Sequence, residues 1–409
     1  MIKINKSKRY FFLIFIIQGI ALFIINQKHG IKIVCDSPRY LNYADKLTEG
    51  MYFDPHNFWY FAYVVYVYVC NSISGGSVSL IIYGQYILNI LAVFLFYKTI
   101  VLLYSKPKIA FLGTLFFITF YEISLWSTYI LSESLYVSLL CFCFYFLTKL
   151  YLQKASKIDK CLGFCLLFIS VLAKPTAVAL LAAILFSGLF LMLKKSKFKV
   201  LNYCILALSV FLFFGLLEKM LTTFHWVDRD YVKGEIIYGT KGLVNYRKNL
   251  DGLFIVSKTK IKIPSKQLPE VIRLFVFVYQ NSTYWFTLFF HKSFYFISHT
   301  RPYWSIYHNI FSILYLVVLY LCFLLALIKK NHSKLVLLFS FSFLLLQFCA
   351  VTFSTVDWDG RFLLPCIPLL ILLSAKELYC IFEALLSANH KLINLLKKVI
   401  NKKNDEIVF

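Results

Sequence analysis

Acidic residues are scarce in this chain. Asp and Glu number 19 against 43 Lys and Arg, and charged residues of both signs make up only 15% of the 409 residues, whereas hydrophobic residues make up 60%. Soluble domains are roughly half apolar. This composition excludes an ordinary soluble protein. Apolar runs that recur from one end of the chain to the other indicate an all-α polytopic membrane protein.

The chain also lacks the short motifs of several site types. It contains no Walker loop, no GxGxxG between a strand and a helix, and no GxSxG elbow. Its eight histidines show no metal-ligand spacing, and its eleven cysteines are scattered, mostly inside apolar segments. We therefore predict neither a cytosolic nucleotide site, nor a structural zinc site, nor a disulfide framework.

The net charge of +24 does not indicate nucleic-acid binding, because the basic residues do not share one solvated face. They fall in short clusters between apolar runs, at 3–9, 98–108, 149–160, 194–199, 329–334 and after Lys391. This is the pattern of basic cytoplasmic loops in membrane proteins. Such clusters also attract anionic membrane lipids.

We predict about ten membrane-spanning helices (range 9–12) in a single transmembrane domain over residues 1–409, since a span needs roughly 20 apolar residues. The first run follows a basic stretch without a small-residue cleavage site, so it is predicted to be a retained helix. The expected spans are 10–27, 79–104, 108–126, 130–151, 161–175, 177–194, 200–219, 307–328, 335–354 and 362–382.

Placing the basic clusters inside predicts a multi-pass protein of the plasma (inner) membrane with both termini in the cytoplasm. The outer side then receives two long loops, 28–78 and 220–306, and short connections at 127–129, 174–175 and 357–361.

Two apolar stretches do not fit as simple spans. The stretch 58–73 would invert the following basic loops if it crossed, so we expect a juxtamembrane helix, interfacial or re-entrant, on the outer face. The stretch 271–298 is interrupted by polar residues and is expected to be interfacial, with a true span as the alternative.

Four of the few acidic residues lie between positions 36 and 54, directly after the first span. Asp36 is the first candidate for chemistry, because a carboxylate beside the bilayer could act as a general base or hold a divalent cation, Mg²⁺ or Mn²⁺. Asp before Pro38 is equally a common helix cap, and both roles fit this residue.

Other costly charged groups are expected at the same outer face, where ionisable groups tend to meet a cavity or a partner. Glu133 lies about one turn into a predicted span and needs a partner there. Arg361, Lys174 and Arg301 stand at span boundaries and could bind phosphate, although a single boundary cation can also extend to the lipid head groups. His308 stands at the outer start of a helix, where a hydrogen-bonded structural role is the alternative.

The order of these features resembles the GT-C superfamily of integral membrane glycosyltransferases, in particular bacterial members related to protein mannosyltransferases and lipid A aminoarabinose transferases. The motifs that carry the resemblance are short. They are Asp36-Ser37-Pro38-Arg39-Tyr40, Ile130-Leu131-Ser132-Glu133-Ser134-Leu135, Leu172-Ala173-Lys174-Pro175 and Gly360-Arg361-Phe362-Leu363-Leu364-Pro365.

The resemblance implies transfer of a sugar from a polyprenyl-phosphate donor to a lipid, glycan or protein at the extracytoplasmic face. It assigns Asp36 as the catalytic base. Arg361, Lys174 and Arg301 are expected to bind the donor phosphate, and Tyr40, Glu133, Glu49 and His308 to contact substrate. The chain departs from the family in two places: Ser37 stands where many members have Glu, and Lys174 stands where Arg is usual.

Two other functions remain open on the sequence. A transporter or flippase for lipid-linked glycans fits the topology and a Glu within a span, although we find no related halves. A polysaccharide polymerase or ligase would act on similar substrates, and it would depend more on Arg301 and His308 than on Asp36.

Overall fold

The computed structural model describes residues 6–34, 36–47, 49–50, 54–195, 199–243, 250, 252–257 and 260–405. Within these ranges the protein is all-helical, with three isolated β-bridges in place of a sheet. The predicted fold class, an all-α polytopic membrane protein, is therefore confirmed at this level.

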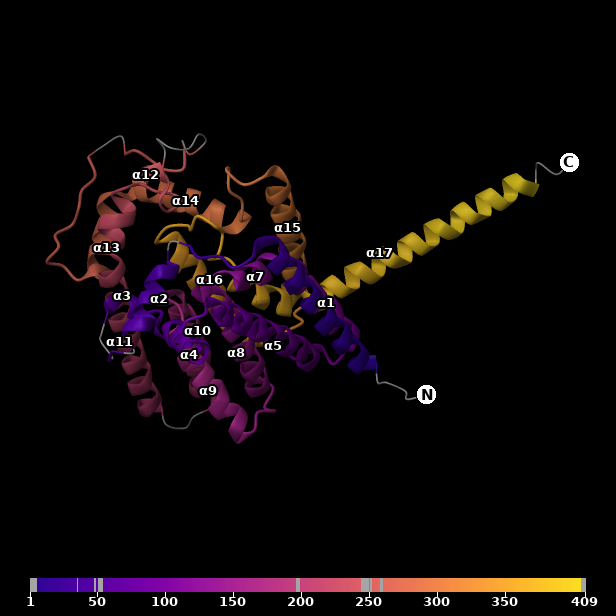
Figure 1. The fold of residues 1–409 in the computed structure, drawn as a ribbon, viewed down its shortest axis with the longest axis horizontal. Helices are drawn as coiled ribbons and strands as arrows, with labels where there is room; N and C mark the ends of the chain where they lie inside the picture. Colours follow the sequence, from indigo (N-terminus) through magenta and orange to yellow (C-terminus); the bar gives the residue numbers. More distant parts are fainter. Residues whose placement is uncertain are drawn as a thin grey trace.

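The N-terminal half of the protein contains the segment 28–78 with its short helices and the first candidate spans (Figure 1). Its elements are α1 Lys6–His29, α2 Ser37–Lys46, α3 Pro55–Phe58, α4 Phe61–Ser74, α5 Val78–Tyr104, α6 Pro107–Thr119, α7 Glu122–Leu125, η1 Trp126–Thr128, α8 Ser132–Tyr151, α9 Lys157–Val171, η2 Pro175–Ala177 and α10 Val178–Lys195.

The C-terminal half contains the segment 220–306 with its short helices and the last candidate spans. Its elements are α11 Lys199–Phe224, the π-helical turn η3 Val227–Tyr231, α12 Thr240–Leu243, α13 Glu270–Gln280, α14 Ser282–Ser298, α15 Ile306–Ile328, α16 Lys334–Thr352 and α17 Cys366–Asp405. The core is formed where α5 packs on α8, α10 on α16, and α17 on α15 and α6.

Seven of the described helices are long and apolar enough to cross a membrane, or eight if one bent pair counts as a single span. With the bent pair counted as one span, these helices coincide with eight of the ten expected spans. The other two behave differently: α9 has only 15 residues, and the apolar part of α17 contains Lys376, Glu377 and Glu383. The chain is thus a multi-pass membrane protein, and its total of ten spans stays a prediction.

The expected span 108–126 is not one straight helix. It bends by 61° between α6 and the α7–η1 segment, and α8 begins only at Ser132. The connection between them pairs with the end of the first outer segment, because Lys32 N–H donates to the Thr128 carbonyl and Ile130 N–H donates to the Lys32 carbonyl. This pairing sets the position at which α8 starts.

Gln85, inside the bundle, stabilises the connection between α6 and α8 through hydrogen bonds. Its side-chain amide on α5 donates to the carbonyls of Ser127 (2.9 Å) and Tyr129 (2.8 Å), and its carbonyl oxygen accepts from the Tyr63 hydroxyl. Carbonyl groups left by a helix break need such donors where water is absent. The same contacts place α4 against the first turns of α5.

The two apolar stretches that did not fit as spans are short helices. α4 has 14 residues, and the stretch 271–298 breaks at Asn281 into α13 and α14. None of the three is among the described helices that could span a membrane by length and composition. These helices are shorter than the roughly 20 residues that a span needs, and their interfacial placement stays a prediction.

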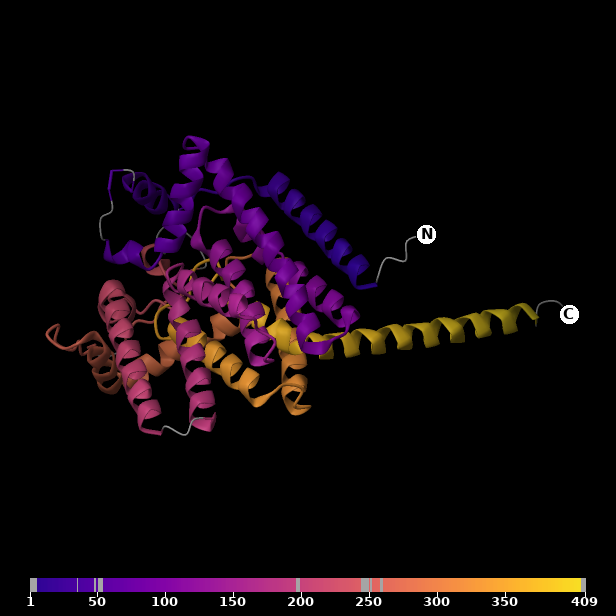
Figure 2. The same ribbon diagram turned by 90° about the horizontal axis from the view of Figure 1, so that it is seen from below.

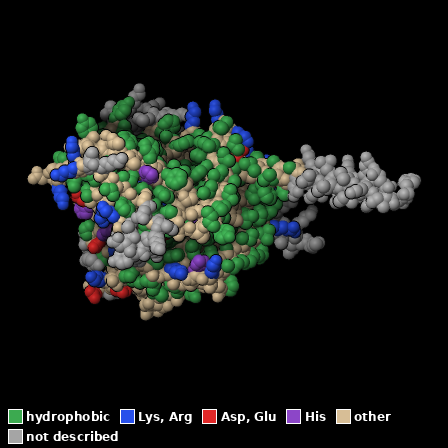
Figure 3. Space-filling model, turned by 90° about the horizontal axis from the view of Figure 1, so that it is seen from above, with side chains coloured by type: hydrophobic (Ala, Val, Ile, Leu, Met, Phe, Trp, Pro, Cys, Tyr) green, Lys and Arg blue, Asp and Glu red, His purple; other side chains and the backbone are tan. Residues whose placement is uncertain are grey.

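α17 leaves the body of the protein on the same side as the start of α1, as both views show (Figure 2). Before it leaves, Glu377 accepts from Lys329 and Asn331 in the turn between α15 and α16. Hydrophobic side chains cover much of the face seen in Figure 3, and Lys and Arg gather toward its margins. Such a surface is suited to lipid contact.

We predict that Gln85→Leu destabilises the protein, because the Ser127 and Tyr129 carbonyls lose their donor in the interior. The expected cost is about 1–3 kcal/mol for each carbonyl left unsatisfied. The measurement is the thermal unfolding midpoint of the purified protein in detergent. Gln267→Leu changes an exposed glutamine and serves as the control. Equal midpoints for the wild type and Gln85→Leu would contradict the assignment.

Candidate functional site

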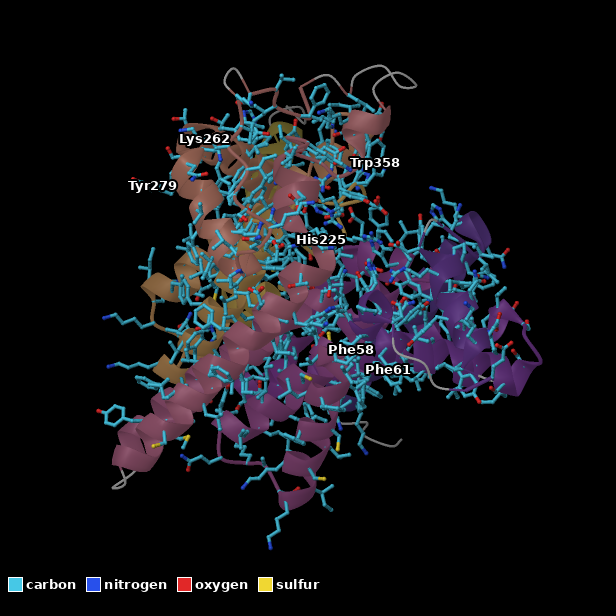
Figure 4. The ribbon with its side chains drawn as sticks, turned by 90° about the vertical axis from the view of Figure 1, so that its left-hand side faces the viewer. Phe58, Phe61, His225, Lys262, Tyr279 and Trp358 are labelled. Atoms are coloured by element: carbon cyan, nitrogen blue, oxygen red, sulfur yellow. The ribbon has the colours of Figure 1, made fainter. Side chains whose placement is uncertain are left out.

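A cavity of about 210 Å³ lies among α2, η2, η3, the end of α16 and the loop 353–365. The charged and imidazole side chains of its lining are Asp36, Arg39, His56, Lys174, Arg229, Asp357 and Arg361. Figure 4 views this side of the molecule: His225, at the end of α11, lies between Trp358 and Phe58, both next to or within the cavity lining. Segments from four distant parts of the sequence thus meet at one place.

Asp36 stands at the start of α2 and does not cap it. Its side chain makes no capping hydrogen bond. Instead, Oδ2 accepts from Arg361 Nη2 at 3.3 Å, and Oδ1 lies 3.8 Å from Arg39 Nη2. The side chain of Asp36 remains 39% exposed and lines the cavity. The carboxylate is therefore available to a ligand, as the catalytic prediction requires.

Glu133 finds the partners that its position predicted. Its Oε1 accepts from Lys174 Nζ at 2.9 Å and lies 3.4 Å from Arg361 Nη1. Glu133 and Lys174 are 4% and 2% exposed, so each charge depends on the other for compensation. Lys174 also lies over the Phe362 ring, 4.9 Å from its centroid. Arg361 joins both carboxylates, which brings Asp36, Glu133 and Lys174 into one network.

The loop that carries Arg361 is held by Arg301. Arg301 is 1% exposed, and its guanidinium donates to the carbonyls of Asp357, Tyr295 and Thr300. It does not line the cavity. The structure therefore places Arg301 behind the loop, where it positions Arg361, and not on the surface where the sequence analysis expected it to meet phosphate.

Gly360 allows the loop to pack closely. Its φ of +79° is a conformation that only glycine adopts readily, and a Cβ there would lie 2.4 Å from His299 Cε1 and 2.8 Å from the Trp304 ring. The loop therefore rests directly on His299.

His308 also lies outside the cavity lining. Its Nε2 is 2.7 Å from Glu122 Oε1, and His299 Nε2 is 2.7 Å from Glu122 Oε2. The Trp304 ring stacks on His308 with centroids 4.1 Å apart. Sequence reasoning missed Glu122 and His299. A Glu inside an expected span signals a partner, but spacing alone does not say which residue that partner is.

The two other residues that were predicted to contact substrate, Tyr40 and Glu49, do not line the cavity. Tyr40 is buried beneath Arg39: its hydroxyl accepts from Arg39 Nη2 at 3.1 Å, and the guanidinium lies 4.6 Å from its ring centroid. Tyr40 therefore supports a residue of the cavity. Glu49 is exposed and does not line it.

Four charged or imidazole side chains of the lining were given no role by the sequence analysis: Arg39, His56, Arg229 and Asp357. Arg229 comes from the segment 220–306 and pairs with the buried Asp230 through two contacts of 2.7 and 3.1 Å. Burial, followed by the charge of Arg39, lowers the pKa of His56 to about 4, so this imidazole is neutral near pH 7. Arg39 belongs to a quoted motif, whereas Arg229 belongs to none.

The groups around Asp36 do not fit a divalent cation. Both carboxylate oxygens face guanidinium groups, whose positive charge repels a second cation. In the part of the chain that is described, ligand atoms close enough to hold a metal occur at His225, Asp228 and Glu270, outside the cavity lining. There Arg273 already binds both carboxylates. We therefore derive no step through a metal.

We predict that Lys174→Met lowers the thermal midpoint strongly, because it leaves Glu133 buried with less compensating charge. Breaking a buried pair costs about 3–5 kcal/mol. Glu133→Gln together with Lys174→Met should recover much of that loss, since position 133 then no longer carries a buried charge. Lys154→Met, at an exposed position, is the control. A double variant less stable than Lys174→Met would contradict the pairing.

A pH dependence follows from Asp359. Burial raises the pKa of Asp359 from 3.8 to about 6, against the opposing charge of Arg361. The folded state therefore holds this proton more tightly, and stability falls as pH rises from 3.8 to about 6, by about 1–3 kcal/mol. Asp359→Asn should flatten this part of the curve of thermal midpoint against pH. Identical slopes would contradict it.

Comparison of the chain with protein-family models, with curated proteins and with solved structures finds no match. The resemblance to the GT-C superfamily therefore rests on the short motifs quoted above. What can be inferred about function rests on the cavity and on the residues that line it.

Proposed function

We propose that the protein is a membrane glycosyltransferase that moves a sugar from a polyprenyl-phosphate donor to a lipid, glycan or protein acceptor. In this proposal it lies in the plasma membrane with both termini in the cytoplasm, and the cavity opens to the extracytoplasmic side. The observation that carries the proposal is the position of Asp36. Its carboxylate lines the cavity and shares Arg361 with the buried Glu133–Lys174 pair.

The composition of the cavity supports a lipid-linked substrate. Charged side chains line the cavity, and the ends of α11 and α16 contribute the apolar side chains of Met220, Phe224, Ala350 and Val351. Both helices are candidate membrane spans. A substrate with a phosphate next to an isoprenoid chain matches this combination, because its head group is anionic and its tail is apolar.

The reaction that fits is a single displacement. Asp36 accepts the proton of the acceptor hydroxyl as the oxygen attacks the anomeric carbon of the sugar. The new bond joins that oxygen to the anomeric carbon, and the bond from the carbon to the phosphate oxygen breaks. The electron pair leaves with the lipid phosphate, and the anomeric configuration inverts.

The cations of the cavity have a defined task in this reaction. Negative charge grows on the leaving phosphate, and preorganised positive groups in a site of low dielectric stabilise it. Arg361 and Lys174 supply this charge. Arg301 acts indirectly, since its bonds to the Asp357 carbonyl hold the loop that presents Arg361.

One observation favours this proposal over a polymerase or ligase that depends on Arg301 and His308. Neither residue lines the cavity: Arg301 is buried behind the loop, and His308 is bound to Glu122. A transporter for lipid-linked glycans shares the topology, and the transfer assay below separates it from a transferase.

We predict that Asp36→Asn abolishes transfer of labelled sugar from a pool of polyprenyl-phosphate sugars in membranes, because the hydroxyl loses its base. Loss of a general base costs about 10²–10⁴-fold in rate. The assay compares membranes that contain equal amounts of wild type, Asp36→Asn, Arg361→Gln and Asp45→Asn. Asp45 lies in the same outer loop, is exposed and serves as the matched control.

The outcomes separate the parts of the proposal. Full transfer by Asp36→Asn would remove Asp36 as the base. Transfer by the wild type that does not exceed that of membranes without the protein would overturn the glycosyltransferase assignment and favour transport.

A further inference from the structure

Three cations at the cavity share two carboxylates. Lys174 and Arg361 both contact Glu133, and Arg361 and Arg39 face the two oxygens of Asp36. Asp357 belongs to a different pair, with Arg301. Asp357 and Asp359 also act on Arg361, so its charge is largely compensated within the network, whereas Arg39 stands at the edge, with Asp36 Oδ1 3.8 Å away.

Arg39 is held in place largely by neutral groups. Its Nη1 donates to Asn57 Oδ1 at 3.1 Å and its Nη2 to the Tyr40 hydroxyl at 3.1 Å, while the nearest Asp36 oxygen is 3.8 Å away, beyond hydrogen-bond distance. The guanidinium also lies 4.7 Å from the Tyr60 ring centroid. These contacts fix its orientation without neutralising its charge.

Arg229 approaches the same part of the cavity from η3. Its side chain is 34% exposed, it lies 5.4 Å from the centroid of the Tyr238 ring, and both residues line the cavity. His56 lines the cavity as well, and the charges of Arg39 and Arg229 both act on it. The neutral imidazole thus adds no charge of its own to the part of the lining that holds these two guanidinium groups.

We propose that Arg39 and Arg229 form a second phosphate subsite, distinct from the one assigned to Lys174 and Arg361. Guanidinium groups donate hydrogen bonds to phosphate oxygens and favour an anion over a neutral sugar hydroxyl. Arg229 would use Nη1, since its Nε and Nη2 already bind Asp230. The inference rests on the proposed function, because it takes the first phosphate to be that of the lipid donor.

Two sources would supply this second phosphate. In one, the donor is a polyprenyl diphosphate, and its two phosphates lie on the two sides of Asp36. In the other, the donor is a monophosphate, and the second phosphate belongs to the acceptor. The chemistry of the subsite is the same in both cases.

The test measures binding of polyprenyl monophosphate and polyprenyl diphosphate to the purified full chain in detergent, followed by Trp fluorescence, since Trp226 and Trp358 line the cavity. The variants are Arg39→Gln and the pair Arg229→Gln with Asp230→Asn, which avoids leaving Asp230 buried without its partner. Lys262→Gln, which removes an exposed positive charge, is the control. In Figure 4, Lys262 and Trp358 lie on opposite sides of His225, at the end of α11.

If the donor carries both phosphates, wild type binds the diphosphate about tenfold more tightly than the monophosphate, and each cavity variant loses this preference. If the acceptor carries the second phosphate, the two lipids bind equally. Inorganic phosphate then binds to protein saturated with the monophosphate, and both cavity variants lose that binding.

The inference is overturned if wild type shows neither the preference nor phosphate binding, or if the cavity variants behave like Lys262→Gln. Failure of the proposed function gives a different result, because the wild type then binds neither polyprenyl lipid. The thermal midpoint of each variant is measured first. If one cavity variant fails to fold, the other still tests the inference, since Arg39 and Arg229 lie on separate elements.

Discussion

The contact of Glu133 with both Lys174 and Arg361 is the interaction on which the structure around the cavity depends. Burying these groups away from water costs several kcal/mol for each ion, and only close partners offset that cost. The three residues come from the start of α8, the junction between α9 and η2, and the loop before α17. Their pairing therefore fixes three elements relative to one another, and Arg361 extends the arrangement to Asp36.

A second set of contacts supports this network from behind. Gln85 sets the connection that precedes α8, while Arg301 and the close approach of Gly360 to His299 set the loop that carries Arg361. Each of these groups satisfies backbone atoms or fills space that the broken helices leave. The site is thus built from helix ends, and polar side chains take the role that regular hydrogen bonding plays within a helix.

Much of this arrangement could be predicted from the sequence, for a physical reason. Basic clusters and span lengths predict which connections share one face. From this alone, Asp36, Glu133, Lys174 and Arg361 were expected at the same face, and the structure brings them into one network. Topology does not decide which side of a loop a residue occupies, so Arg301 and His308 were expected in the cavity and lie behind it. Arg229, Glu122 and His299 depend on tertiary partners far away in sequence. The bend after α6 was missed because the run 108–126 is apolar throughout most of its length, whereas its direction depends on the partners of Glu122.

The course of α17 has a practical consequence for imaging this protein. The helix begins shortly after the loop of Arg361, is anchored at Glu377, and continues without a break into a part that projects from the body (Figure 1). Residues 381–388 are exposed. A helical fusion partner joined in register within this segment would be held in one orientation, because an uninterrupted helix transmits its direction. Such a fusion would add a rigid landmark for aligning single particles of this membrane protein.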